Sequence, residues 1–285
     1  MMGGGSRAYH PAVLLLVDLD GVVYRGAQAV PGVAAVLKRR AAAGDRIVYV
    51  TNNSRWHRDE YRASLLGLGV PLAGDGADSI VTAARAAAIV LSERTPRPTV
   101  AMVFGGPGLA RELREVGMRT VSPTPRGLAA APDVLAVGVD FRLSYERLST
   151  AAEAVRRGAL FVATNRDPVY PVADGLKAGA GSIVAAVAAA CGKEPDIVIG
   201  KPQTRLFEAA AELAGVPARD AVVIGDGLTT DIRAANAVGA RSVLMLTGVT
   251  SRDDLARAPA SAHPTAVAHD AAELERVLEA MSNAA

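Results

Sequence analysis

The feature that most constrains this chain is an unbroken apolar run, Val13 to Val17, that ends directly in Asp18-Leu19-Asp20-Gly21. Such a run is typical of a strand buried on both faces, as in a parallel sheet. Because residues i and i+2 of a strand point the same way, the carboxylates of Asp18 and Asp20 could face one site. Open α/β sheets bind ligands at the carboxyl ends of their strands. Two acids there suit a hard cation such as Mg²⁺, although Asp and Gly are also ordinary turn residues.

Composition narrows the class of protein. Half of the 285 residues are apolar and only 4% are aromatic, which is typical of an α/β protein with one large or two ordinary domains. The near balance of 31 basic and 29 acidic residues argues against a nucleic-acid surface. No apolar run reaches the ~18 residues that span a bilayer, so no membrane partner is expected. We expect residues 1–10 to be a loose tail rather than a secretory signal, a cytoplasmic location, and Cys191 to be a small buried hydrophobe.

A second strand end carries hydroxyl and amide side chains. The predicted strand Arg46 to Val50 leads to Thr51-Asn52-Asn53-Ser54 and then to a helix from about 56 to 67. This βαβ order predicts a parallel sheet. A strand end that meets a helix start offers free backbone N–H groups to an anion, although the same residues are also common helix caps. We expect residues 56–58 to form an exposed first helical turn.

The middle of the chain, from about 85 to 194, is expected to form a second α/β domain inserted within the first. Residues 79–93 are predicted as one Ala-rich helix, followed by a linker at 94–98 and by strands at 99–104, 134–139 and 160–163. The glycines of FGGPGL at 104–109 do not match a dinucleotide-binding fingerprint and indicate a plain strand, turn and helix. Asn165 and Asp167 follow the last of these strands, where they suit either a substrate-facing rim or ordinary turn chemistry.

Two further strand ends supply a lysine and two acids. A short strand at 196–199 leads to Gly200-Lys201-Pro202, and a strand at 221–224 leads to Gly225-Asp226, with Asp231 at the start of a helix. Pro202 stiffens the backbone at Lys201, whose charge could reach a pocket, although a lone lysine is more often exposed. Asp226 could join the first acid pair around one cation.

Together these segments resemble the four motifs of the haloacid dehalogenase (HAD) superfamily of phosphotransferases. They are DLDGV at 18–22, VTNN at 50–53, GKP at 200–202 and GDGLTTD at 225–231. The insertion is similar to the large cap of the nitrophenylphosphatase, phosphoglycolate phosphatase and glycerol-phosphate phosphatase branch. The resemblance implies a Rossmann-like parallel-sheet core, residues 1–84 and 195–285, with an inserted α/β cap, residues 85–194. Departures from that branch at 106–107 and 177–178 lie in the cap and bear on substrate choice.

The resemblance also implies a role for each motif. Asp18 would be the nucleophile that forms an aspartyl-phosphate, and Asp20 would protonate the leaving oxygen and later deprotonate water. Mg²⁺ would be bound by Asp18, the backbone carbonyl of Asp20 and Asp226, with Asp231 bracing these ligands. The phosphoryl oxygens would be held by Thr51, Asn53, Lys201 and the backbone of Asn52. The implied partner is a small phosphorylated metabolite, and pairing of two chains through the cap stays open.

Several alternatives remain at this stage. Glycerol 3-phosphate and 2-phosphoglycolate are the substrates that the resemblance carries, and a sugar phosphate or pyridoxal phosphate is an alternative. A receiver-like phospho-accepting switch uses similar residues, but receivers are about half this length and lack an inserted domain. A phosphomutase or dehalogenase would keep the fold. Asp20 argues against a dehalogenase, which has no leaving alkoxide to protonate.

Overall fold

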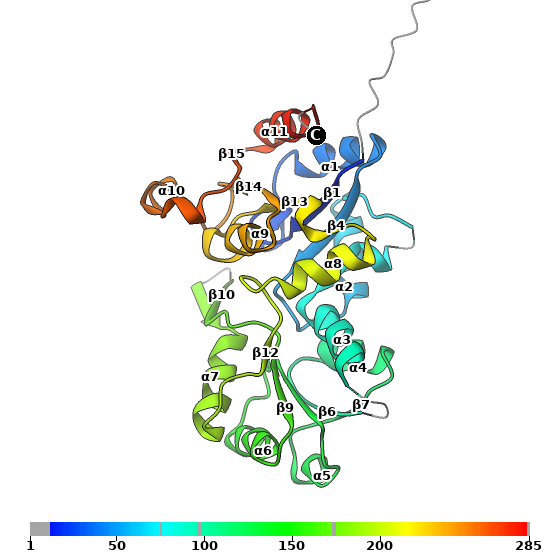
Figure 1. The fold of residues 1–285 in the computed structure, drawn as a ribbon, viewed down its shortest axis with the longest axis vertical. Coiled ribbons are helices and arrows are strands. Elements are labelled where there is room, and N and C mark those ends of the chain that lie inside the picture. The colour runs from blue at the N-terminus through cyan, green and yellow to red at the C-terminus, as the bar shows by residue number, and fades with distance from the viewer. Residues whose placement is uncertain (1–11, 75, 96–98, 173–174, 284–285) are drawn as a thin grey trace, which may run out of the picture.

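The structure, a computed structural model, describes residues 12–74, 76–95, 99–172 and 175–283 (Figure 1). It contains two parallel sheets, each flanked by helices, which confirms the predicted α/β class. The segment expected to be a loose tail lies outside the described residues, and so does part of the predicted linker. Within the described ranges, every helix is too short or too polar to cross a bilayer.

The first sheet contains six parallel strands in the order β15-β14-β13-β1-β4-β5. Its strands are β1 (Leu14–Asp18), β4 (Arg46–Thr51), β5 (Ile80–Thr82), β13 (Val222–Gly225), β14 (Arg241–Met245) and β15 (Ala266–Ala268). Its helices are α1 (Val33–Ala42), α2 (Arg58–Gly67), α3 (Ala83–Arg94), α8 (Arg205–Leu213), α9 (Arg233–Val238), α10 (Arg252–Arg257) and α11 (Ala271–Asn283). Strand β1 lies between β13 and β4, and its side chains are buried in apolar clusters on both faces. The apolar run therefore forms the central strand that its pattern predicts.

The second sheet contains five parallel strands in the order β12-β9-β8-β6-β7. Its strands are β6 (Val100–Phe104), β7 (Arg119–Val121), β8 (Val134–Val137), β9 (Leu160–Ala163) and β12 (Ile197–Val198). Its helices are α4 (Pro107–Glu115), α5 (Pro125–Leu128), α6 (Tyr145–Arg156) and α7 (Ala180–Cys191). Figure 1 shows this sheet and its helices below the first sheet, with α3 and α8 between the two.

The structure bears on the proposed division of the chain at two points. Strand β12 pairs with β9, so the short strand placed after residue 194 lies in the second sheet. Helix α3 contacts α4 and α8 at once, so a cut before residue 85 would fall inside a helix that bridges the two halves. The limits 1–84, 85–194 and 195–285 stay a prediction.

Several elements differ from the sequence prediction. Residues 79–93 are not one helix, because Ile80, Val81 and Thr82 pair with β4 as a short strand, and the hydroxyl of Thr82 then caps α3. β-branched residues favour strands where a neighbouring strand can pair with them. Two hairpins were not predicted: β2 (Tyr24–Arg25) with β3 (Gln28–Ala29), and β10 (Val169–Val172) with β11 (Gly175–Ala178). Cys191 ends α7 and is only partly buried.

Candidate active site

Three buried aspartates converge at the carboxyl edge of the first sheet. Asp18 is the last residue of β1, Asp226 follows β13, and Asp231 lies in the π-helical turn Leu228–Ile232 that leads into α9. One carboxylate oxygen from each lies within 4.8 Å of the other two, and none of the three residues is more than 7% exposed. The fold thus brings together the acids of the first and last motifs.

Lys201 lies inside this acidic cluster. Its Nζ donates hydrogen bonds to Oδ1 of Asp18 and to Oδ1 of Asp231, both at 2.6 Å. The residue is only 3% exposed, so it is not a surface lysine. Burial by itself would lower the pKa of Lys201, but the two adjacent carboxylates outweigh that effect and raise the pKa. The ammonium therefore stays charged and neutralises part of the cluster.

The remaining negative charge makes the cluster suitable for a divalent cation. Burial raises the pKa of Asp18 well above its ordinary value, and the charges of Asp231 and Asp226 add to this while Lys201 opposes it. Burial and the charge of Asp231 also raise the pKa of Asp226 to about 6. These raised pKa values mean that the positive charge of Lys201 does not fully compensate the carboxylates around it. Mg²⁺ supplies positive charge and prefers hard oxygen donors such as carboxylates. The residues present therefore fit Mg²⁺.

Two glycines allow Asp226 to reach this position. A Cβ atom at Gly21 would lie 2.1 Å from Oδ2 of Asp226, and a Cβ at Gly248 would lie 1.8 Å from the same oxygen. Gly21 also has a φ of 78°, which disfavours other residues. The backbone N–H of Val249 donates to this oxygen at 2.7 Å. Close backbone contact on one side therefore holds the Asp226 carboxylate in place.

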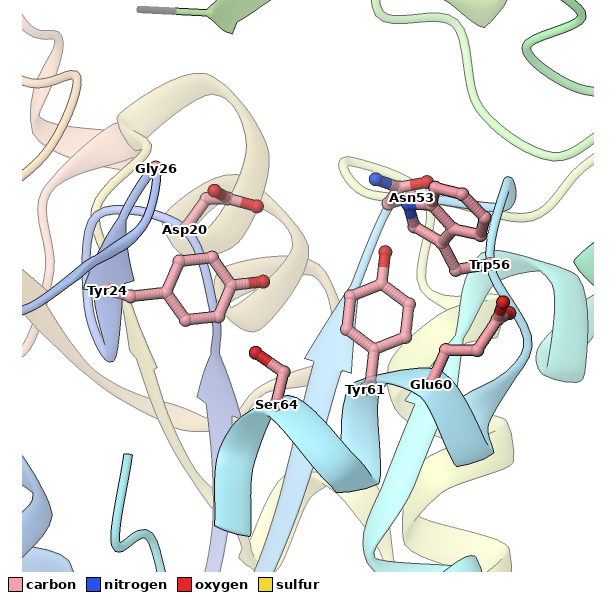
Figure 2. Close-up of a pocket in the computed structure, with 8 residues that line it drawn as sticks. All are labelled: Asp20, Tyr24, Gly26, Asn53, Trp56, Glu60, Tyr61 and Ser64. Carbon is pink, nitrogen blue, oxygen red and sulfur yellow. The ribbon is translucent and has the colours of Figure 1, made fainter. Parts of the chain in front are cut away.

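Asp20 occupies a different environment from Asp18. Asp20 is exposed and lines the pocket drawn in Figure 2. Desolvation by the surrounding protein raises the pKa of Asp20, and the charge of Lys201 opposes this shift. A carboxyl group with a raised pKa is suited to carry and deliver a proton.

The polar residues at the end of β4 have two different sets of neighbours. Thr51 is buried and its Oγ1 accepts from the backbone N–H of Asn53 at 3.2 Å, while Asn53 lines the pocket. The side chain of Asn52 is already engaged. Its Oδ1 accepts from Lys201 N at 2.7 Å, and its Nδ2 donates to Lys201 O and to Asp167 Oδ2, each at 2.9 Å. The side chain of Asn52 is therefore committed to Lys201 and Asp167, and a role for its backbone in substrate binding stays a prediction.

The two cap residues singled out from the sequence contact the same asparagine. Asn165 Nδ2 donates to Asn52 O at 2.7 Å, and Asp167 accepts the bond from the Asn52 amide. Burial raises the pKa of Asp167, which the Asn52 hydrogen bond opposes. Neither residue lines the pocket described below. These bonds join the second sheet to the β4 end, and a substrate-rim role for Asn165 and Asp167 stays a prediction.

A pocket of about 450 Å³ opens beside Asp20. Figure 2 shows its lining residues, which are Asp20, Tyr24, Gly26, Asn53, Trp56, Glu60, Tyr61 and Ser64. Most of them were not predicted from the sequence, in which residues 56–58 were expected to form an exposed first helical turn. Trp56 is exposed as expected and also lines the pocket, whereas His57 is 2% exposed and caps α2, which the prediction did not include. The available signal was position, because these residues directly follow the DLDG and TNN motifs.

Comparison with known proteins gives matches along most of the chain. Residues 15–119 match the family described as haloacid dehalogenase-like hydrolase, and residues 198–274 match the HAD-hydrolase-like family. Chronophin of Homo sapiens is 38% identical over 266 residues, which cover 90% of this chain and 86% of chronophin. The D-glycerol 3-phosphate phosphatase of Mycobacterium tuberculosis is 37% identical over 262 residues, covering 92% of this chain and 70% of that protein. A crystal structure of glycerol phosphate phosphatase from the same organism, in complex with magnesium, superposes with a TM-score of 0.83 at 36% identity, covering 92% of this chain and 76% of that one.

Proposed function

This chain belongs to the haloacid dehalogenase-like hydrolases and is a phosphoric monoester hydrolase, and on this premise we propose that it hydrolyses glycerol 3-phosphate with Mg²⁺ through an aspartyl-phosphate on Asp18. The observation that carries the proposal is the convergence of Asp18, Lys201, Asp226 and Asp231 within one buried cluster. Phosphoryl transfer depends mainly on positioning and charge neutralisation, which such a cluster provides.

In the first step a carboxylate oxygen of Asp18 attacks phosphorus and the bond to the leaving oxygen breaks. Lys201 lies against Asp18 and offers its ammonium to the phosphoryl oxygens, whose charge it offsets. Thr51 and Asn53 stand at the adjacent strand end, where hydroxyl, amide and backbone N–H groups can hold the same oxygens. The Asn52 side chain holds Lys201 in position, because it forms hydrogen bonds with both the backbone N–H and the backbone carbonyl of Lys201.

Asp20 moves the protons. In its acid form it donates a proton to the leaving alkoxide, so that an alcohol departs. The resulting carboxylate then takes a proton from water, whose oxygen attacks phosphorus and releases Asp18 and inorganic phosphate. The raised pKa of Asp20 supports this cycle between the two protonation states.

Mg²⁺ would be held by the carboxylates of Asp18 and Asp226 and by the backbone carbonyl of Asp20. Asp231, which binds Lys201 and the backbone N–H of Gly227, would fix these groups from behind. When bound, the ion neutralises phosphoryl charge and orients the phosphate. The magnesium complex of the mycobacterial glycerol phosphate phosphatase supports the choice of Mg²⁺ as the ion.

Phosphate release from a panel of monoesters tests the proposal. The panel contains glycerol 3-phosphate, 2-phosphoglycolate, a hexose phosphate, pyridoxal phosphate and p-nitrophenyl phosphate, each measured with Mg²⁺ and with a chelator. We expect Mg²⁺-dependent release with the highest kcat/KM on glycerol 3-phosphate. A higher value on another substrate would replace glycerol 3-phosphate, and one phosphate per chain, without turnover, would favour the receiver-like switch. Cytoplasmic location and pairing through the cap stay predictions, the latter measurable by sedimentation.

A further inference from the structure

We infer that the hydroxyl groups of Tyr24, Tyr61 and Ser64 form the leaving-group subsite and select an uncharged polyhydroxy alcohol over an alcohol that carries a carboxylate. This inference rests on the proposed function, because it assigns the alcohol half of the same substrate. It names the residues that bind that half, and it separates glycerol 3-phosphate and sugar phosphates from 2-phosphoglycolate.

The three hydroxyls lie where the leaving alcohol must be. Asp20 lines the pocket and is the proposed proton donor, so the leaving oxygen has to be next to it. Tyr24 lies just beyond Asp20, in the strand that follows the DLDG turn, whereas Tyr61 and Ser64 are three positions apart on α2 and so share one helix face. Figure 2 shows the hydroxyls of Tyr24 and Ser64 below the Asp20 carboxylate, and the hydroxyl of Tyr61 across the pocket, directed toward Asn53.

Tyr61 supplies the observation that points to a ligand. Tyr61 is only 7% exposed, and its hydroxyl has no hydrogen-bond partner among the described residues. A buried hydroxyl without a partner costs free energy, which a hydroxyl of a bound alcohol would offset. Burial, reinforced by the charge of Asp20, raises the pKa of both Tyr24 and Tyr61. Both phenols therefore keep their protons and can donate as well as accept.

The charges around the pocket disfavour an anionic leaving group. The lining residues include the acids Asp20 and Glu60 but no lysine, arginine or histidine. The guanidinium of Arg55 lies over the rings of Trp56 and Phe141 at 4.2 and 4.1 Å, and its charge opposes the rise in the pKa of Tyr61. Lys201 is not among the lining residues, and its ammonium donates to Asp18 and Asp231. Among the lining residues a carboxylate would therefore face two acids and no cation, whereas a polyol would face hydroxyl groups.

The lining also suits the carbon skeleton of a polyol. The pocket volume of about 450 Å³ falls within the range of small-molecule sites. Trp56 is 37% exposed and offers an apolar ring face to C–H groups, and Figure 2 shows Tyr61 on the same side of the pocket and Tyr24 on the opposite side. Apolar walls with a few placed polar groups are typical of small-molecule sites.

The test compares kcat/KM on glycerol 3-phosphate, 2-phosphoglycolate and p-nitrophenyl phosphate, whose leaving group has no aliphatic hydroxyl. The variants are Tyr61→Phe and Tyr24→Phe. The matched control is Tyr49→Phe, because the Tyr49 hydroxyl is also buried but donates to Pro71 O, away from the pocket. We expect Tyr61→Phe to lose about tenfold in kcat/KM on glycerol 3-phosphate, which one hydrogen bond can supply. The value on p-nitrophenyl phosphate should stay within twofold, and Tyr49→Phe should leave the ratio of the two unchanged.

Three outcomes would overturn the inference. Preference of the unmodified enzyme for 2-phosphoglycolate would contradict the charge argument, and an equal loss on all three substrates would contradict the hydroxyl argument. Unchanged selectivity in both Tyr61→Phe and Tyr24→Phe would exclude the subsite while leaving the phosphatase proposal intact. The failure of the phosphatase proposal is distinct, because hydrolysis of p-nitrophenyl phosphate would then be absent as well.

Discussion

The ammonium of Lys201 donates a hydrogen bond to Oδ1 of Asp18 at 2.6 Å, although 183 positions separate the two residues in the chain. The contact places a permanent positive charge beside the proposed nucleophile, inside a cluster in which Asp226 and Asp231 would otherwise repel an incoming phosphate. Lys201 also reaches Asp231, so it links the first and last motifs of the core. Loss of either acid would leave a buried ammonium with one partner.

The first prediction concerns the nucleophile. Asp18→Asn should abolish Mg²⁺-dependent phosphate release from p-nitrophenyl phosphate, because an amide cannot form the acyl phosphate. Asp253→Asn, which changes the same charge at an exposed position in α10, should leave the rate unchanged. Near-normal activity in the Asp18 variant would remove the covalent step from the mechanism.

The second prediction separates the two roles of Asp20. Asp20→Asn should lose at least ~10² in steady-state rate, the low end for a general acid or base. With p-nitrophenyl phosphate the first step should survive, because the leaving phenolate needs no proton, whereas hydrolysis of the aspartyl-phosphate should be slow. Stopped-flow measurement should show a burst of about one nitrophenolate per chain. A loss below tenfold, or a slow first step, would argue against the assignment.

The third prediction follows from the pKa of about 6 at Asp226. This folded-state value lies above the ordinary 3.8, so the carboxyl group favours the metal-free fold fully below pH 3.8, and this contribution is lost as the pH rises through about 6. A cation that binds the ionised form reverses the loss and releases a proton. Mg²⁺ should therefore raise Tm more at pH 7.5 than at pH 5. An equal rise in Tm at both values would show that Asp226 is not coupled to the metal.

The fourth prediction concerns Asn52, whose side chain joins Lys201 to Asp167. Asn52→Ala should leave buried backbone groups of Lys201 without partners and destabilise the protein by about 1–3 kcal/mol. Because the Lys201 ammonium would lose its fixed position, kcat should fall about tenfold or more. Denaturant unfolding and steady-state kinetics measure the two effects. Unchanged kcat with lower stability would limit Asn52 to a structural role.

The fifth prediction tests the contact between α4 and the segment that leads into α2. Gly108 N donates to Arg55 O at 2.9 Å, and a Cβ atom at Gly108 would lie 2.2 Å from the backbone carbon of Trp56. Gly108→Ala should displace the segment that carries Asn53 and Trp56 and raise KM. Gly67→Ala, at a helical position with open space around it, is the matched control. If both variants keep the KM of the unmodified enzyme, the α4 contact does not position the pocket.

Part of this site could be predicted from short stretches of the sequence. The run before Asp18 predicted the central strand, and the polar residues at the ends of β1, β4 and β13 predicted which of their side chains gather at the edge of the first sheet. These inferences worked because strand character and strand ends depend on residues next to each other in the chain. The parallel arrangement then puts all carboxyl ends of one sheet at one edge.

What the sequence by itself determined was therefore the class of the fold and the identity of the charged groups. Only the tertiary structure decided that β12 pairs with β9 rather than with the first sheet, and that Lys201 is buried. It also decided that the Asn52 side chain forms hydrogen bonds with Lys201 and Asp167. The tertiary structure also placed Tyr24, Trp56 and Tyr61 in the lining of the pocket. These features arise from contacts between distant segments, whose packing and electrostatic energies do not appear in any local pattern of residues.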